Sequence, residues 1–239
     1  MIGIIGGNGV AATNKLNALI EEKMTMNGAY RDAHHPEIIT WQATKVPSRS
    51  MYLEGKGESF IPGYIEIGKM LKNCGCTELC MCCNTAHYAI DILEKEIDLP
   101  FINIIEEVAL KIREKGCKRI GIMCSDGLRN VKLYDQYIKK YTPDAEVIYP
   151  SMNEQILVTK GICNSKNTAR YLPAENNENP NTCFEIICKS LERQQVDCIV
   201  AGCTDICNVY QGFTINKNII YLDSLVVLSE AIIKKITNE

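Results

Sequence analysis

Two stretches of the chain recur about 120 residues farther on, and this repeat constrains the fold more than any other feature. Ile2–Gly9, which reads IGIIGGNG, matches Ile120–Gly127, IGIMCSDG, at an offset of 118. Leu79–Thr85, LCMCCNT, matches Ile199–Asp205, IVAGCTD, at an offset of 120. The spacing between the two motifs therefore differs by only two residues between the copies. A repeat of this length predicts two related halves.

Between these motifs, short apolar runs rich in Ile and Val alternate with stretches that have helical periodicity. The runs that predict strands are Ile2–Ile5, Glu37–Trp41, Glu78–Cys82, Phe101–Ile104, Arg119–Cys124, Glu146–Tyr149, Cys198–Ala201 and Ile219–Leu222. The stretches that predict helices are Ala12–Lys23, Tyr64–Asn73, Ala86–Glu96, Ile105–Lys115, Val131–Lys140, Thr182–Gln195 and Leu225–Ile236. Strands that alternate with full helical crossovers form parallel sheets, so an α/β fold is predicted. The polar segment 163–181 is predicted to be a surface loop that could cover a cleft.

Charge and hydropathy exclude several partners. The 239 residues carry a formal net charge of −3, and the isoelectric point is near 5.8. No basic stripe is available, so we expect no nucleic-acid or membrane partner. The start, MIGIIGG, lacks the cationic region of a secretory signal, and no apolar run approaches the length of a membrane span. These features predict a cytoplasmic protein.

Thirteen cysteines are an odd number, which in a reducing compartment predicts free thiols rather than a disulfide framework. Cys74-x-Cys76 and Cys80-x-Cys82 resemble the close pairs of zinc sites, but such pairs usually lie on turns. Cys80 and Cys82 lie instead within a predicted buried strand, where cysteine acts as a small hydrophobic residue. We therefore predict no metal site. Cys83 differs because it falls where the strand ends.

Cys83 and Cys203 occupy equivalent positions in the repeat. Both lie at the carboxyl end of a predicted strand, where open α/β sheets bind ligands, and each precedes a helix start that can bind a carboxylate. If the halves face each other, the two sulfurs approach one ligand from opposite sides. Such a pair can remove a proton from one face of a carbon and return it on the other. That chemistry is racemisation without a cofactor.

Other interpretations of these motifs are weaker. Gly7-x-Gly9-x-x-Ala12 after a strand resembles a dinucleotide fingerprint, but the second strand ends without the acidic residue that would bind a ribose. A thiol redox or metal-binding module would use the cluster 74–83 and would leave Cys203 without a role. His87, in the first turn after Cys83, could polarise that cysteine or could serve as a structural hydrogen-bonding group.

The chain resembles the Asp/Glu racemase superfamily, and within it the aspartate racemases. The motifs that carry this resemblance are Cys83-Asn84-Thr85-Ala86-His87, Ala201-Gly202-Cys203-Thr204-Asp205, Gly6–Gly9, Arg31-Asp32-x-x-His35-Pro36 and Val46-Pro47-Ser48-Arg49. The resemblance implies two similar α/β domains related by pseudo-twofold symmetry, an active site between them, no cofactor, and usually a homodimer. We expect the first domain to comprise residues 1–100 plus about 208–239, and the second residues 101–207. A related isomerase or decarboxylase is the alternative within the superfamily, although single-thiol members keep only one cysteine of the pair.

The resemblance also implies roles for particular residues. Cys83 and Cys203 would be the acid/base thiols, and Arg49 would bind the side-chain carboxylate of aspartate, or of glutamate as an alternative acidic amino acid. The implied contacts with the α-carboxylate come from Asn84, Thr85 and Thr204.

Several positions depart from the family pattern. Asn8 and Val10 stand where the family usually has Met and Pro, and Asn8 could contact the ligand or merely form the turn. Ser125-Asp126 replaces two threonines, Asp205 replaces a glutamate, and Lys166 is shifted by about one position from a substrate-binding lysine. We include Asn8, Ser125 and Lys166 among the predicted substrate contacts. Asp126 would repel a dicarboxylate or attract an ammonium group.

Overall fold

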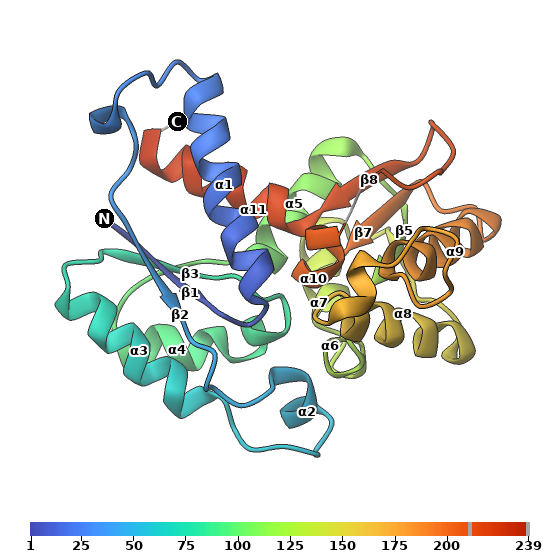
Figure 1. The fold of residues 1–239 in the computed structure, drawn as a ribbon, viewed down its shortest axis with the longest axis horizontal. Helices are drawn as coiled ribbons and strands as arrows, with labels where there is room; N and C mark the ends of the chain where they lie inside the picture. Colours follow the sequence, from blue (N-terminus) through green and yellow to red (C-terminus); the bar gives the residue numbers. More distant parts are fainter. Residues whose placement is uncertain (210–211, 238–239) are drawn as a thin grey trace.

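The computed structural model describes residues 1–209 and 212–237, and it contains two parallel sheets with flanking helices (Figure 1). One sheet has the strand order β2-β1-β3-β4, and the other has the order β6-β5-β7-β8. The strands are β1 (Ile2–Gly6), β2 (Ile38–Gln42), β3 (Glu78–Met81), β4 (Phe101–Ile102), β5 (Arg119–Met123), β6 (Glu146–Ile148), β7 (Cys198–Ala201) and β8 (Ile220–Asp223). All eight predicted strands are present, and their ends agree with the prediction to within two residues.

The repeat in the sequence is also a repeat of topology. In the first sheet Gly3 of β1 lies opposite Leu79 of β3, and in the second Gly121 of β5 lies opposite Ile199 of β7. These four residues are the equivalent positions of the two repeated motifs. The predicted α/β fold with two similar halves is therefore confirmed.

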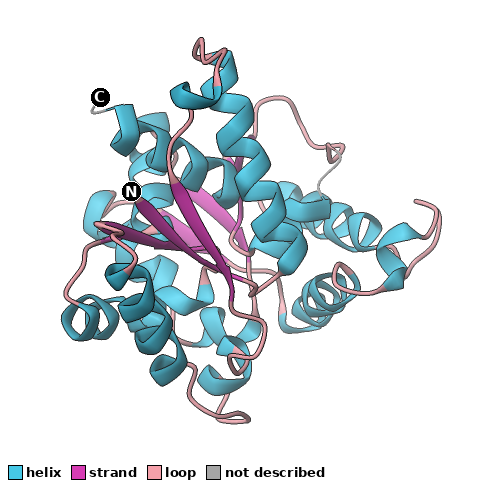
Figure 2. Cartoon of the chain, turned by 60° about the vertical axis from the view of Figure 1, so that its left-hand side comes forward, coloured by secondary structure: helices cyan, strands magenta, loops and turns pink. Residues whose placement is uncertain are grey.

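Helices lie on both sides of the strands (Figure 2). The α-helices are α1 (Val10–Met26), α2 (Arg49–Leu53), α3 (Ile61–Asn73), α4 (Ile90–Ile97), α5 (Ile104–Lys115), α6 (Asp126–Asn130), α7 (Leu133–Tyr141), α8 (Met152–Asn164), α9 (Pro180–Arg193), α10 (Thr204–Val209) and α11 (Ser224–Thr237). Three 3-10 helices, η1 (Asp32–His34), η2 (Thr85–Ala89) and η3 (Thr168–Tyr171), complete the described elements.

All seven predicted helices are present, but four others were not predicted. α2, α6 and α10 are five or six residues long, too short for a helical period to show in the sequence. α8 is longer and begins with a capping box, in which Ser151 and Glu154 each bond to the other's backbone N–H. The pattern S-x-x-E is a sequence signal for a helix start, so it could have revealed α8. The predicted loop 163–181 contains the end of α8, the whole of η3 and the start of α9.

The sheets assign two strands differently from the expected domains. β4, expected at the start of the second domain, pairs with β3 of the first sheet. β8, expected in the first domain, pairs with β7 of the second sheet. The reason is that each half completes its own four-stranded sheet before the chain leaves it. Within the expected segment 208–239, residues 210, 211, 238 and 239 lie outside the described residues.

The helices that follow these last strands cross to the opposite half. α5 follows β4 and packs against α7 of the second half, whereas α11 follows β8 and packs against α1 of the first half. α5 and α11 also pack against each other, near the middle of the molecule (Figure 1). Each half therefore packs against a helix that follows the last strand of the other half. Of the expected first-domain segment 208–239, α11 packs against α1 and β8 pairs with β7.

Strand β3 is buried from Leu79 onward, as its apolar sequence predicts, and only its first residue, Glu78, is partly exposed. Cys80 and Cys82 have no exposed surface and belong to the hydrophobic core. No group of three or more His, Cys, Asp or Glu side chains in the described part of the chain could hold a metal ion. Cys76, Cys80 and Cys82 therefore serve packing, whereas Cys74 is exposed. Among the described helices, none has the length and hydropathy of a membrane span.

Candidate active site

Two of the thirteen cysteines are partly exposed at the carboxyl ends of equivalent strands. Cys83 follows β3 and Cys203 follows β7, and both line one cavity of about 350 Å³ between the halves. Of the other eleven, nine are buried, while Cys74 and Cys163 are exposed. Topology therefore places at one cavity the two thiols that the repeat makes equivalent.

Every other residue that the sequence suggested for the site lines the same cavity. These residues are Asn8, Arg49, Asn84, Thr85, Ser125, Lys166 and Thr204. They come from both halves, from the loop after β1, from α2 and from the chain after α8. The structure brings all nine candidates together at one cavity.

The backbone after Cys83 is held by His87. The imidazole Nδ1 lies 2.9 Å from the Cys83 carbonyl oxygen, and Nε2 accepts a hydrogen bond of 3.3 Å from the Ile104 N–H. Nδ1 therefore carries the proton and the ring is neutral. Burial lowers the pKa of His87 to about 4, which keeps it neutral in the physiological range. Both ring nitrogens contact backbone, so His87 is the structural hydrogen-bonding group of the two alternatives considered above.

The Asn84 side chain connects the two halves. Tyr134 donates a hydrogen bond of 2.6 Å to Oδ1 of Asn84, and Nδ2 of Asn84 donates one of 3.0 Å to Ser224. Both partners belong to the second half of the chain, and the Asn84 side chain is buried. The amide thus has a positioning function that its sequence motif did not reveal, and only one N–H of the side chain is left for a substrate.

Further hydroxyl groups bond across the cleft. The Thr85 and Ser125 hydroxyl oxygens are 2.9 Å apart, and the Thr204 hydroxyl donates a bond of 3.3 Å to the Cys82 carbonyl oxygen. Ser50 of α2 accepts a bond of 3.1 Å from the N–H of Gly127 in α6. These bonds fix the positions of Cys83 and Cys203 relative to each other.

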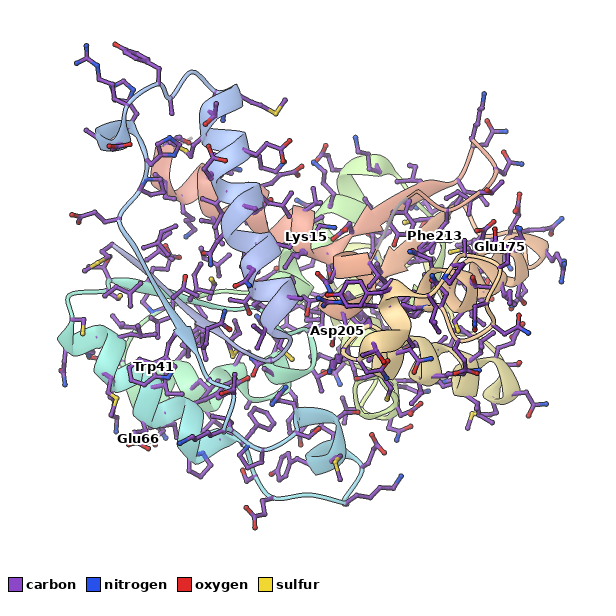
Figure 3. All side chains as sticks on the ribbon, viewed as in Figure 1. Lys15, Trp41, Glu66, Glu175, Asp205 and Phe213 are labelled. Carbon is purple, nitrogen blue, oxygen red and sulfur yellow. The ribbon has the colours of Figure 1, made fainter. Side chains whose placement is uncertain are left out.

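A buried carboxylate and a lysine lie beside Cys203. Oδ2 of Asp205 is 3.8 Å from the Cys203 sulfur and 2.9 Å from Nζ of Lys166. Burial raises the pKa of Cys203 to about 12; the Asp205 carboxylate adds to this effect and Lys166 opposes it. Burial also raises the pKa of Asp205, and Lys166 again opposes the change. Figure 3 shows Asp205 near the middle of the molecule, next to the first turns of α1.

An arginine lies on the side of Cys83. Arg49 begins α2, whose N-cap is Ser48, and its guanidinium donates to the carbonyl oxygens of Pro47 at 2.9 Å and of Val46 and Asn8 at 3.3 Å. Burial alone would lower the pKa of Arg49, but the negative charge near it, chiefly from Cys83, raises the pKa overall. Backbone carbonyl groups therefore hold the Arg49 guanidinium at the cavity wall. Its Nε has no hydrogen-bond partner among the described residues.

Two glycines permit this geometry. Gly7 has a φ of +78°, and a Cβ there would lie 2.4 Å from the Ala43 nitrogen. A Cβ on Gly9 would lie 2.5 Å from Oδ1 of Asp205. Gly7 must be glycine, since side chains rarely adopt a positive φ and the Ala43 backbone leaves no room for a Cβ. At Gly9, where the backbone is extended, a Cβ would push the Asp205 carboxylate out of its position.

Several carboxylates and α8 residues in the cavity wall were not among the predicted contacts. Glu54 of α2 and Thr159 and Cys163 of α8 line the cavity, and so does Asp126. Thr159 donates a hydrogen bond of 2.8 Å to Oδ2 of Asp126. The acidic residue that the sequence places near the site is thus in the wall, where its carboxylate accepts a hydrogen bond from a hydroxyl group.

Comparison with known proteins defines the class of this enzyme. The family model for Asp/Glu/Hydantoin racemase matches residues 2–231. The chain therefore belongs to the Asp/Glu/Hydantoin racemase family. Membership makes it an amino-acid racemase that is independent of pyridoxal phosphate.

Solved structures show the same fold over nearly the whole chain. An aspartate racemase from Picrophilus torridus is 25% identical, with a TM-score of 0.79 over 98% of this chain and 93% of that one. An aspartate racemase homologue from Pyrococcus horikoshii OT3 is 20% identical, with a TM-score of 0.74 over 100% and 99% of the two chains. A glutamate racemase isoform from Bacillus anthracis is 14% identical, with a TM-score of 0.65 over 100% and 82%.

Proposed function

We propose that this racemase interconverts L- and D-aspartate with Cys83 and Cys203 as its two acid/base groups. The observation that carries this proposal is that two partly exposed thiols from equivalent strand ends line one cavity from opposite halves. Inversion at Cα requires one group to remove the proton from one face and another to deliver a proton to the opposite face. Family membership and the similarity to an aspartate racemase support the same reaction.

The environments of the thiols suggest which one starts as the acid. Because the pKa of Cys203 is raised to about 12, this residue is a thiol at neutral pH and can donate a proton. Cys83 would then be the base for the enantiomer whose α-hydrogen faces it. The other enantiomer requires Cys203 as thiolate, a form that Lys166 favours through its positive charge.

The cavity wall offers groups for both ends of an acidic amino acid. Arg49 would bind the side-chain carboxylate, because a guanidinium matches a carboxylate with two parallel hydrogen bonds. Thr85, Thr204 and Ser125 would contact the α-carboxylate, and Asp126 would attract the ammonium group. Glutamate is the second candidate substrate, since the same groups would serve a longer side chain.

A deuterium wash-in screen tests this proposal. Purified protein in D₂O should incorporate deuterium at Cα of both L- and D-aspartate, and each enantiomer should approach the racemic mixture. Glutamate and alanine provide the comparison for side-chain charge. Absence of exchange on aspartate, with exchange on a neutral amino acid, would overturn the assignment of substrate.

We further propose that the protein acts as a cytoplasmic homodimer on a small acidic amino acid. Composition supports the location and the absence of nucleic-acid and membrane partners, and the family resemblance supports the dimer. Light scattering after size-exclusion chromatography tests the dimer directly. A thiol redox or metal-binding function is not favoured, because most cysteines of the cluster 74–83 are buried in the core.

A further inference from the structure

A second cavity of about 440 Å³ adjoins the catalytic cavity. We call it the outer chamber. The two cavities share the wall residues Asn8, Ser48, Arg49, Lys166 and Asp205. The rest of the outer chamber is formed by the start of α1, by Thr44 and Val46 after β2, and by Ser165 and Arg170 near η3. A ligand long enough to extend from the catalytic cavity beyond these shared residues would enter the outer chamber.

The N-terminus of α1 opens into the outer chamber. Val10 and Ala11, the first residues of this 17-residue helix, line it. The N-cap is Gly9, which has no side chain, and no side-chain cap bonds to the first turn. The N–H groups of a first turn have no partner within their helix, and the helix dipole gives them a positive potential. Such an end attracts anions.

A buried side chain beside this end lacks a hydrogen-bond partner. Asn8 is only 5% exposed, and neither its Oδ1 nor its Nδ2 has a partner among the described residues. The nearby Tyr64 hydroxyl is buried and, within the described part of the chain, also lacks a partner that meets hydrogen-bond geometry. Burial raises the pKa of Tyr64, and the Asn8 side chain opposes this rise by hydrogen bonding toward the hydroxyl, so the two unsatisfied groups are neighbours. A buried amide without a partner is costly, so it indicates a polar ligand atom.

The charges around the outer chamber also favour an anion. Its wall holds the cations Arg49, Lys166 and Arg170 and the carboxylate of Asp205, which is paired with Lys166 at 2.9 Å. Arg170 lies over the ring of Tyr171, with its guanidinium carbon 4.5 Å from the centroid, and it also donates to the Tyr171 hydroxyl. The cation that faces the chamber from η3 is therefore held in place.

We propose that the outer chamber binds the distal carboxylate of an acidic amino acid longer than aspartate, such as 2-aminoadipate. This inference rests on the proposed function, because the α-carbon must lie between Cys83 and Cys203. The distal carboxylate then lies at the start of α1, with Asn8 and Arg170 as partners. Aspartate is too short to pass Arg49, so it leaves the outer chamber to solvent.

The test compares Arg170→Gln with a matched control. Arg113→Gln removes an exposed arginine that also lies over a tyrosine, with its guanidinium carbon 5.6 Å from the Tyr141 centroid, but that lines neither cavity. Arg170→Gln should lower kcat/KM for 2-aminoadipate by about tenfold, the loss of one charge-assisted hydrogen bond, mainly through KM. The kcat/KM for aspartate should change by less than about twofold, since one partly exposed charge contributes little at a distance. The control, Arg113→Gln, should leave kcat/KM unchanged for both substrates.

A binding measurement separates this inference from the proposed function. Calorimetric titration of Cys83→Ser with 2-aminoadipate and with aspartate requires no turnover. Adding Arg170→Gln to the Cys83→Ser protein should weaken the binding of 2-aminoadipate and leave the affinity for aspartate unchanged. If Arg170→Gln weakened the binding of both ligands equally, or of neither, the proposed subsite would be wrong even if the enzyme racemises aspartate. Inhibition by acetate that depends on Arg170, with unchanged affinity for 2-aminoadipate, would assign the chamber to free anions instead and would also overturn it.

Discussion

The two halves of the molecule share one topology but give their cysteines different surroundings. Cys83 faces the Arg49 guanidinium, and its backbone is fixed by a neutral histidine. Cys203 lies 3.8 Å from the buried Asp205 carboxylate, and its pKa is raised to about 12. The difference shows that a duplicated backbone supplies two equivalent positions for a thiol, whereas neighbours that differ between the halves give each thiol its own electrostatic environment. Cys203 lies beside a carboxylate and a lysine, and Cys83 lies beside an arginine.

The largest expected effect comes from removing either thiol. Cys83→Ser and Cys203→Ser should each reduce racemisation by about 10²–10⁴-fold, the contribution of a positioned acid/base group. Each variant should still exchange the α-hydrogen of one enantiomer, because one thiol still serves one face. Deuterium exchange of L- and D-aspartate, followed separately, measures this split. Cys74→Ser, an exposed cysteine outside the cavity, is the control. Racemisation by Cys203→Ser at the wild-type rate would contradict the two-thiol mechanism.

The next largest effect concerns Arg49, the cation at the start of α2 beside Cys83. Arg49→Ala should raise the activation free energy for aspartate by about 3 kcal/mol, the lower limit for breaking a buried charge pair. This corresponds to a loss of about 10²-fold in kcat/KM. Alanine should lose much less, since it has no distal carboxylate. Arg49→Lys should restore part of the loss, because one ammonium group cannot reproduce the bidentate contact. Equal losses on alanine and aspartate would mean that Arg49 does not recognise the side chain.

A smaller effect is expected from the charge beside Cys203. Asp205→Asn removes a negative charge that disfavours the thiolate and leaves Lys166, which favours it, so the pKa of Cys203 should fall. The pH at which iodoacetamide alkylates Cys203, measured in a Cys83→Ser background, should shift downward. Asp126→Asn is the matched control, because this carboxylate lines the same cavity but is bonded to Thr159. A shift of the same size in both variants would show that Asp205 has no special effect.

The smallest expected effect is on the stability of the fold, and it concerns two equivalent positions in strands β3 and β7. Cys80 of β3 corresponds in the repeat to Val200 of β7, and both are fully buried. Cys80→Val should therefore change the free energy of unfolding by less than about 1.5 kcal/mol, as for other apolar substitutions of similar volume. Cys80→Ser should cost about 1–3 kcal/mol, because it buries a hydroxyl without a designed partner. Urea denaturation measures both. Equal cost for the two variants would contradict a purely apolar role for Cys80.

Much of the fold was predictable because it depends on local patterns. Apolar runs such as Cys198–Ala201 located the strands, since a strand covered on both faces must be apolar throughout. The pairing of the last strand of each sheet does not follow from such local patterns. Whether Ile220–Asp223 joins one sheet or the other depends on pairing with a distant strand, which local sequence does not encode. The short helices α2, α6 and α10 were missed for a related reason, because long-range contacts stabilise them more than their own propensity does.

The sequence by itself determined that two thiols would lie at equivalent strand ends, because a repeat copies local structure together with its motifs. It also supplied the candidate contacts at one edge of each sheet. Only the tertiary structure decided that Asn84 holds the halves together, that His87 is neutral, and that Lys166 pairs with Asp205 beside Cys203. These properties depend on burial and on distances between atoms far apart in the chain. Hydrogen bonds and pKa values follow from such distances, and they form only when the two halves meet.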